Sequence, residues 1–134
     1  MEEEIKVKAC LAVVSHHAIL LVQRIHSDTL EKYWSLPGGR VFFGDSVDVV
    51  ALRYFEEETG LKAGVTGFMD VVENIIPNKP YHSLTITLYG TLLDDEAFNR
   101  SPADPEKSRW FTQEALKELN IHPEAVIYKA LGVA

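Results

Sequence analysis

The sequence predicts an α/β fold in which strands come first, then a helix, then further strands and helices. Two short apolar runs, Ala9 to Val14 and Ala18 to Val22, are separated by three polar residues and are typical of buried strands joined in a hairpin. The stretch Ser46 to Thr59 contains no Gly or Pro and is expected to be helical. From Tyr81 to Leu93 apolar and polar residues alternate, as in a half-buried strand. This order of elements is that of an α/β domain.

The central helix is framed by signals at both of its ends. Gly44 precedes Asp45, a residue type that favours the N-cap, so we expect the helix to begin there. Gly60 stands where a left-handed C-terminal residue is favoured, so we expect the helix to end there. The apolar residues of this stretch fall on one broad arc, which predicts a core side formed by Val47, Val50, Ala51 and Phe55.

The remaining strands and helices are predicted from shorter signals. A strand is expected from Val65 to Ile76, followed by a break at Pro77 to Pro80, and a last short strand from Glu106 to Phe111. Thr112 is suited to cap a helix through Asn120, and Pro123 to open a final helix that ends before Gly132. The segment Ile25 to Lys32 is polar and is read as a loop.

Three consecutive carboxylates, Glu56, Glu57 and Glu58, lie near the end of the central helix. Carboxylates crowded into less than one turn repel one another unless a cation or an arginine compensates, and Arg53 lies one turn before Glu57. Crowded carboxylate oxygens are the ligands that Mg²⁺ or Mn²⁺ prefers. Taken alone, such a triplet is more often a solvated helix end.

Together with the preceding glycine turn, the stretch Gly38 to Leu61 resembles the box of the Nudix hydrolase family, G-x5-E-x7-R-E-U-x-E-E-x-G-U, with U a bulky aliphatic residue. The matching positions are Gly39, Arg53, Glu57, Glu58, Gly60 and Leu61, and Phe55 fills an aliphatic position. The segments WSLPGG and RWFTQEAL resemble the family too, so the resemblance covers nearly the whole chain. A long motif with fixed spacing favours kinship over chance.

Two residues depart from the box. Asp45 stands where the box has Glu, which keeps the charge but shortens the reach by one methylene. Tyr54 stands where the box has the first Glu of its Arg-Glu pair. A phenol with a pKa of ~10 is a poor substitute for a carboxylate as metal ligand or base near neutral pH. We therefore expect reduced activity.

The resemblance implies a Nudix-type α/β/α sandwich around a mixed β-sheet. It also implies Mg²⁺-dependent hydrolysis of the pyrophosphate bond in a nucleoside diphosphate linked to another group, with Mn²⁺ as a possible replacement. On this basis Glu57 and Glu58 would ligate the metal together with the backbone carbonyl of Gly38, and Arg53 would hold Glu57. A further carboxylate is implied just before the RWF segment, for which Glu106 is preferred over Asp104, although an ordinary charged residue explains Glu106 equally well.

Four residues outside the metal-binding set are candidates for substrate binding. Arg24 ends the second strand, where the family often places an arginine near substrate phosphates, although a surface ion pair explains it equally well. Phe42 and Phe43 are expected in an exposed loop, where two large rings indicate a ligand edge or a contact between subunits. His82 opens the long strand and is a candidate for contact with a base or phosphate, or an ordinary edge histidine.

Length, charge and cysteine content narrow the class of protein. The chain has 134 residues and 46% hydrophobic composition, which predicts a single domain over residues 1–134. Its net charge of −7 works against non-specific binding to nucleic acid or an anionic membrane, and an anionic substrate would need a cation bridge. A lone cysteine, Cys10, an acidic start and the absence of a membrane-length apolar run favour a cytoplasmic protein.

Three functions stay open at this point. The first is a Mg²⁺-dependent pyrophosphohydrolase acting on a small nucleotide. The second is a catalytically impaired nucleotide-binding module of the same fold, and the third is a homodimeric interaction protein that uses the Phe42–Phe43 edge. Tyr54 distinguishes the first from the second, because an intact enzyme would have a carboxylate there.

Overall fold

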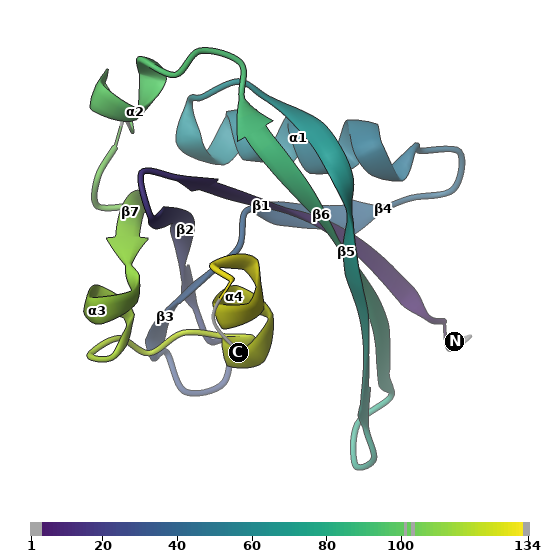
Figure 1. Cartoon of the computed structure of the whole chain (residues 1–134). Coiled ribbons are helices and arrows are strands. Elements are labelled where there is room, and N and C mark those ends of the chain that lie inside the picture. The colour runs from purple at the N-terminus through teal and green to yellow at the C-terminus, as the bar shows by residue number, and fades with distance from the viewer. Residues whose placement is uncertain (1–3, 101, 103, 133–134) are drawn as a thin grey trace.

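The computed structural model describes residues 4–100, 102 and 104–132 of the chain (Figure 1). Within these residues the chain forms seven strands and four helices. In order they are β1 (Lys6–Ser15), β2 (Ala18–Ile25), β3 (Lys32–Ser35), β4 (Gly38–Val41), α1 (Val47–Thr59), β5 (Ala63–Ile76), β6 (Tyr81–Leu92), α2 (Ala97–Arg100), β7 (Ser108–Thr112), α3 (Gln113–Leu116) and α4 (Glu124–Ala130).

The strands form one mixed sheet with β1 at its centre. Along one edge β1 pairs in parallel with β6, over residues 6–13 of β1. Along the other edge it pairs antiparallel with β4 over residues 7–10 and with β2 at residues 14–15. β5 flanks β6, while β3 and β7 both pair antiparallel with β2. The predicted mixed sheet is confirmed.

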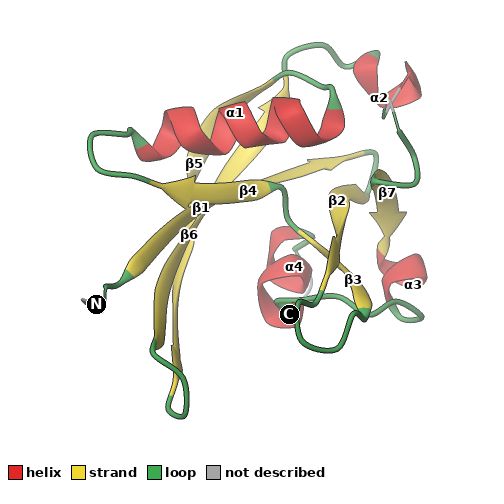
Figure 2. Ribbon diagram, turned by 180° about the vertical axis from the view of Figure 1, so that it is seen from behind, coloured by secondary structure: helices red, strands yellow, loops and turns green. Residues whose placement is uncertain are grey.

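Helices lie on both faces of the sheet, as Figures 1 and 2 show from opposite sides. α1 lies over one face, where Val50 and Phe55 pack against Leu11 of β1 in one buried cluster. α3 and α4 contribute Leu116 and Ile127 to a second buried cluster. Burying one such side chain contributes about 1.5–3 kcal/mol, so each cluster fixes its helix to the sheet. The α/β/α sandwich that the resemblance implied is therefore present.

A two-residue turn joins β1 to β2. His16 and His17 both have positive φ, 52° and 62°, and the turn sets Ser15 opposite Ala18. Positive φ at both central positions is the requirement of the type I′ turn, whose twist matches that of paired strands. The predicted hairpin is confirmed, with His16 and His17 as its turn residues.

The two ends of α1 differ in how well the sequence predicted them. Gly60 has a φ of 77° and donates its N–H to the carbonyl of Glu56 at 2.8 Å, so the predicted C-terminus is confirmed. The predicted N-cap at Asp45 is wrong, because the cap residue is Ser46 and the helix begins at Val47. Asp45 is instead used to close a turn, in which its carboxylate accepts the N–H of Phe42 at 3.2 Å.

Other boundaries also differ from those that the sequence suggested. β3 and β4 were not predicted, because four-residue strands carry almost no periodic signal. The helix predicted from Thr112 through Asn120 is only the short α3, although Thr112 does accept the N–H of Ala115 as its N-cap. The last strand begins at Ser108 rather than at Glu106. None of the helices in the described part of the chain is long and apolar enough to cross a membrane.

Candidate active site

Glu58, in the last turn of α1, connects the helix to the start of β4. Its Oε1 accepts the backbone N–H of Gly38 at 2.9 Å and a hydrogen bond from Nη2 of Arg24 at 3.2 Å. Its Oε2 accepts from Nη1 of Arg24 at 2.6 Å. Charge-assisted, bidentate pairs of this kind are among the strongest and most directional contacts between side chains. The carboxylate is therefore held in one place, beside the glycine turn.

Arg24 itself is held by several acceptors. Its Nε donates to Oγ of Ser35 at 3.0 Å, and its Nη2 donates to the carbonyls of Leu36 at 3.1 Å and Gly38 at 3.3 Å. β2 and β3 place these groups together because Arg24 pairs with the residue that lies two before Ser35. The guanidinium thus joins α1, β2, β3 and β4 at one point.

Tyr54 fills the space between α1 and β4. A Cβ atom at Gly39 would lie only 2.3 Å from Cζ of Tyr54, so the ring lies directly against the glycine backbone. The guanidinium of Arg53 lies 5.5 Å from the centroid of the same ring, which is the geometry of a cation–π contact. Within the described chain no ion pair joins Arg53 to Glu57, and Glu57 is exposed to solvent.

The oxygen atoms near Gly38 are of the types that hard divalent cations bind. Carboxylates at Glu57 and Glu58 and the carbonyl of Gly38 are the donors that such ions take. Among the residues that the structure describes, no group of three or more His, Cys, Asp and Glu side chains is close enough to hold a metal ion. Tyr54 stands in place of a carboxylate, and Asp45 binds the loop amide of Phe42. The types of donor fit such an ion: Glu58 and Gly38 lie together, and the exposed Glu57, next to Glu58 in the helix, is the further residue that would hold it.

A cleft of about 790 Å³ adjoins this point. Residues of β1, β4, β5 and β6 line it together with the segment after β2 and the start of α4, on the sheet face that α1 does not cover. Four cationic side chains line it, Lys8, Arg24, Arg40 and Lys79, against two carboxylates, Asp28 and Glu73. In a chain with a net charge of −7 such a concentration of cations favours an anionic ligand.

Lys8 and Tyr81 form a polar contact in the cleft that the sequence analysis missed. Nζ of Lys8 donates to the phenol oxygen of Tyr81 at 3.2 Å, and Nζ of Lys6 lies 5.5 Å from the centroid of the Tyr81 ring. A hydrogen bond from the Ser83 hydroxyl, and then the neighbouring lysines, lower the pKa of Tyr81. The alternation of side chains along a strand could have predicted this lysine pair. Lys6 and Lys8 are two residues apart, so they share one face of β1, while the residues between and after them form its apolar face.

Of the predicted site residues only Arg24 and Gly38 line this cleft, and the box residues Arg53, Glu57 and Glu58 do not. Phe42 and Phe43 follow β4 and are exposed, Phe43 completely, and the guanidinium of Arg40 lies 4.9 Å from the ring of Phe42. His82 forms an ion pair with Glu73 across β5 and β6 at 2.8 Å. Glu106 is exposed in the turn before β7, where its N–H donates to Asp104 Oδ1 at 3.0 Å.

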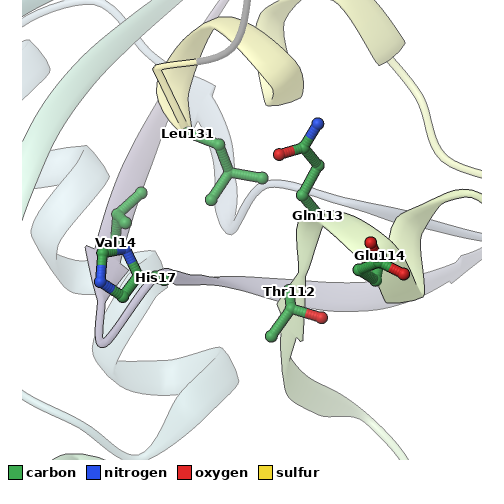
Figure 3. A pocket seen from close by; sticks show the side chains of 6 residues that line it. All are labelled: Val14, His17, Thr112, Gln113, Glu114 and Leu131. Atoms are coloured by element: carbon green, nitrogen blue, oxygen red, sulfur yellow. The ribbon is translucent and has the colours of Figure 1, made fainter.

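A second, smaller pocket of about 280 Å³ lies beside the β1–β2 turn (Figure 3). Its lining is Val14, His17, Thr112, Gln113, Glu114 and Leu131. These described residues include no lysine or arginine to attract a phosphate, and they are not among those that line the larger cleft. The larger cleft, which contains Arg24 and Gly38, is therefore the candidate active site.

Comparison with known proteins identifies the family and the fold. Residues 5–131 match the family model described as NUDIX domain. A MutT NUDIX hydrolase from Burkholderia pseudomallei is 22% identical, with 97% of this chain and 98% of that chain covered and a TM-score of 0.70. An ADP-ribose pyrophosphatase from Streptococcus suis is 20% identical (96% and 91% covered, TM-score 0.68), and a UDP-X diphosphatase is 21% identical (98% and 65%, TM-score 0.71). Identities this low show the fold alone, whereas the family model spans nearly the whole sequence. This chain belongs to the NUDIX domain family.

Proposed function

We propose that the protein is a pyrophosphohydrolase that cleaves a nucleoside diphosphate linked to another group, with Mg²⁺ as its cofactor and with reduced turnover. One observation carries the proposal: Glu58 of the box helix meets the Gly38 backbone and Arg24 at a cleft lined by cations. The cleft volume of about 790 Å³ lies within the range of small-molecule sites. The acidic helix end and an anion-binding cleft therefore adjoin.

Glu57, Glu58 and the Gly38 carbonyl are the groups that would hold the ion. A bound Mg²⁺ supplies charge for the phosphate oxygens and lowers the pKa of an attacking water. Arg24 and Lys8, which both line the cleft, bind and orient the diphosphate. Because Glu57 is assigned to the metal, a further carboxylate would accept the proton of the attacking water. Glu106, which is exposed before β7 and lies outside the cleft lining, is the preferred candidate for this base.

Reduced turnover follows from Tyr54. Its ring takes the place in which the family box has a carboxylate and packs against Gly39. A neutral phenol offers one weak oxygen and no charge, so the cation is bound by fewer strong ligands. Loss of a positioned general base typically costs about 10²–10⁴ in rate. We therefore expect measurable but slow hydrolysis.

The substrate class is supported by two structures with the same fold. Their names, ADP-ribose pyrophosphatase and UDP-X diphosphatase, both describe cleavage of a nucleoside diphosphate joined to a second group.

We place the protein in the cytoplasm because a lone cysteine suits a reducing compartment. A homodimer through Phe42 and Phe43 stays a prediction, which sedimentation of a Phe42→Ser, Phe43→Ser variant tests.

A hydrolysis screen tests the proposal. Nucleoside triphosphates, sugar nucleotides and dinucleoside polyphosphates are incubated with the protein in Mg²⁺ and in Mn²⁺, and the products are separated by chromatography. We expect cleavage of sugar nucleotides that requires the metal and is lost in Glu58→Gln. Glu56→Gln is the matched control, because the exposed Glu56 side chain has no described contact with Gly38 or Arg24.

A nucleotide-binding module is the second candidate function. It is favoured by the same Tyr54 ring and by the neutralisation of Glu58 by Arg24. If nucleotides bind in calorimetry but none is cleaved with either metal, the binding module replaces the enzyme. Cleavage that survives Glu58→Gln would show that the box helix is not the active element.

A further inference from the structure

The guanidinium of Arg24 contacts the same oxygens that the proposed metal site requires. Nη1 lies 2.6 Å from Oε2 of Glu58, while Nη2 lies 3.2 Å from Oε1 and 3.3 Å from the carbonyl oxygen of Gly38. We infer that Arg24 and the divalent cation compete for these oxygens, and that an anionic substrate in the cleft frees them by drawing Arg24 away. The inference rests on the proposed function, because it concerns the same site.

Competition follows from charge and from geometry. A guanidinium is a permanent cation whose planar fork matches a carboxylate in a bidentate manner. A divalent ion placed on Glu58 and Gly38 would face this positive charge at close range and would need lone pairs that Arg24 already engages. Strong binding of the metal therefore requires that the guanidinium move.

Arg24 can move without a change in the backbone. Its side chain is 30% exposed and lines the cleft, and its anchors apart from Glu58 are neutral acceptors, Ser35 Oγ and the Leu36 and Gly38 carbonyls. A diphosphate offers several anionic oxygens to the same fork, and bonds to ionised acceptors are stronger than bonds to neutral ones. A diphosphate that reaches Arg24 thus offers several charged oxygens in place of one carboxylate and three neutral acceptors.

The consequence is coupling between substrate and metal. If the substrate removes Arg24 from Glu58, metal affinity rises when substrate is bound, and by linkage substrate affinity rises by the same factor when metal is bound. A purely structural Arg24 would act in the opposite direction. If Arg24 only held Glu58 in position for the metal, it would increase metal affinity, and its removal would weaken metal binding.

Calorimetric titration of the whole protein with Mn²⁺ separates the two cases. We expect Arg24→Gln to bind Mn²⁺ about tenfold more tightly than the wild type in the absence of nucleotide, a change equivalent to 1.4 kcal/mol. Arg109→Gln is the control, because this arginine of β7 donates to Pro105 and lies near the Trp34 ring, away from Glu58. Glu58→Gln in both backgrounds should abolish the Mn²⁺ binding, which identifies the site.

Ser35→Ala is a milder second variant, useful if Arg24→Gln does not fold. It removes only the hydrogen bond from Arg24 Nε and should raise Mn²⁺ affinity by a smaller factor than Arg24→Gln does.

A non-hydrolysable nucleoside diphosphate analogue tests the coupling directly. After correction for Mn²⁺ bound to the analogue itself, the analogue should raise the Mn²⁺ affinity of the wild type but not that of Arg24→Gln.

Equal or weaker Mn²⁺ binding by Arg24→Gln would overturn the competition. If the wild type still hydrolyses nucleotides with metal in that case, the proposed function stands and only this inference fails. If no variant binds Mn²⁺ and no nucleotide is cleaved, both fail.

Discussion

Tyr54 and Gly39 occupy one space between α1 and β4, and each restricts the other. The ring lies where a Cβ atom of residue 39 would be, so only glycine fits opposite it in this arrangement. The same ring contacts Arg53, the arginine of the box. A substitution at any of these positions therefore changes the packing of the site as well as its charge.

Gly39→Ala should destabilise the fold, because the new methyl group would overlap the Tyr54 ring. Overpacking of this kind typically lowers the free energy of unfolding by about 1–3 kcal/mol, which urea denaturation of Gly39→Ala and the wild type would measure. In a Tyr54→Ala background the methyl group has room, so the cost of Gly39→Ala should nearly vanish. Neighbouring residues typically show coupling of about 0.5–3 kcal/mol. Strictly additive effects would show that the ring does not restrict residue 39.

Tyr54→Glu should raise turnover with Mg²⁺, since it restores the carboxylate of the box. The same change removes the ring from the Gly39 contact and from Arg53, so we expect lower thermal stability. Initial rates on the best substrate and a melting curve measure the two effects. If the wild type already turns over at about 10 s⁻¹ and Tyr54→Glu brings no gain, Tyr54 is not the cause of a reduced rate.

The Cys10 thiol should resist alkylation in the folded protein. Cys10 is half-buried at the cleft wall, and its desolvation is the main reason that its pKa is raised from 9.0 to about 11, with Arg24 and Lys8 opposing the shift. Because the folded state retains the proton at a higher pH than the unfolded state, this thiol lowers stability as pH rises from about 9 to about 11. Iodoacetamide labelling at pH 8, with and without denaturant, and melting curves of wild type and Cys10→Ala up to pH 10.5 test both statements.

At the scale of whole elements, local chemistry predicted some parts well. The β1–β2 hairpin and the C-terminus of α1 depend on neighbouring residues only: a two-residue turn in one case and Gly60 in the other. β3 and β4 were missed because each forms only by pairing with another strand, β3 with β2 and β4 with β1. A four-residue segment contains no pattern that predicts such pairing. The N-cap was misassigned because Asp45 is held by Phe42 instead.

In the candidate site, too, the sequence identified single residues but not the contacts between distant ones. Glu58 was identified from the spacing of the box, but its partner Arg24 lies 34 residues away, and the sequence left open whether Arg24 met phosphate or a carboxylate. The Lys8–Tyr81 contact spans 73 residues and brings together two strands whose pairing the sequence does not state. Contacts of this range depend on the topology of the sheet.

Gly60→Ala should cost about 1–2 kcal/mol, because its φ of 77° is unfavourable for a residue with a side chain. The loss also weakens the end of α1 that carries Glu58. Gly67→Ala in β5 is the matched control: its Cβ would meet nothing within 4 Å, and we expect a change within about 0.5 kcal/mol. Equal losses for the two variants in chemical denaturation would refute the cap explanation.

At the scale of the molecule, charge is distributed unevenly. The chain carries a net charge of −7, yet its cleft gathers Lys8, Arg24, Arg40 and Lys79. Two of these cations are already paired outside the proposed metal site, Arg40 with Glu4 and Lys79 with Asp28. Lys8 contacts the Tyr81 phenol, so its charge is available to a ligand.

Lys8→Gln should weaken nucleotide affinity by about tenfold at low salt, which corresponds to 1.4 kcal/mol. The difference from wild type should shrink as salt screens the charge. Lys62→Gln, at an exposed lysine outside the cleft, controls for net charge. Calorimetry at two ionic strengths measures both variants, and equal effects would show that only overall charge matters.

The parallel pairing of β1 with β6 has a consequence for how the chain folds during synthesis. β1 ends at Ser15 and is synthesised before its parallel partner β6, which begins only at Tyr81. Pairings between segments so distant in sequence form slowly, because a long loop must close first. Until β6 emerges, the cluster around Leu11 and Val13 lacks Leu88 and Leu92, so its apolar side chains are only partly covered and are open to aggregation or to chaperones. Nascent chains that stop before β6 should therefore remain sensitive to protease, whereas chains that extend beyond it can complete the centre of the sheet.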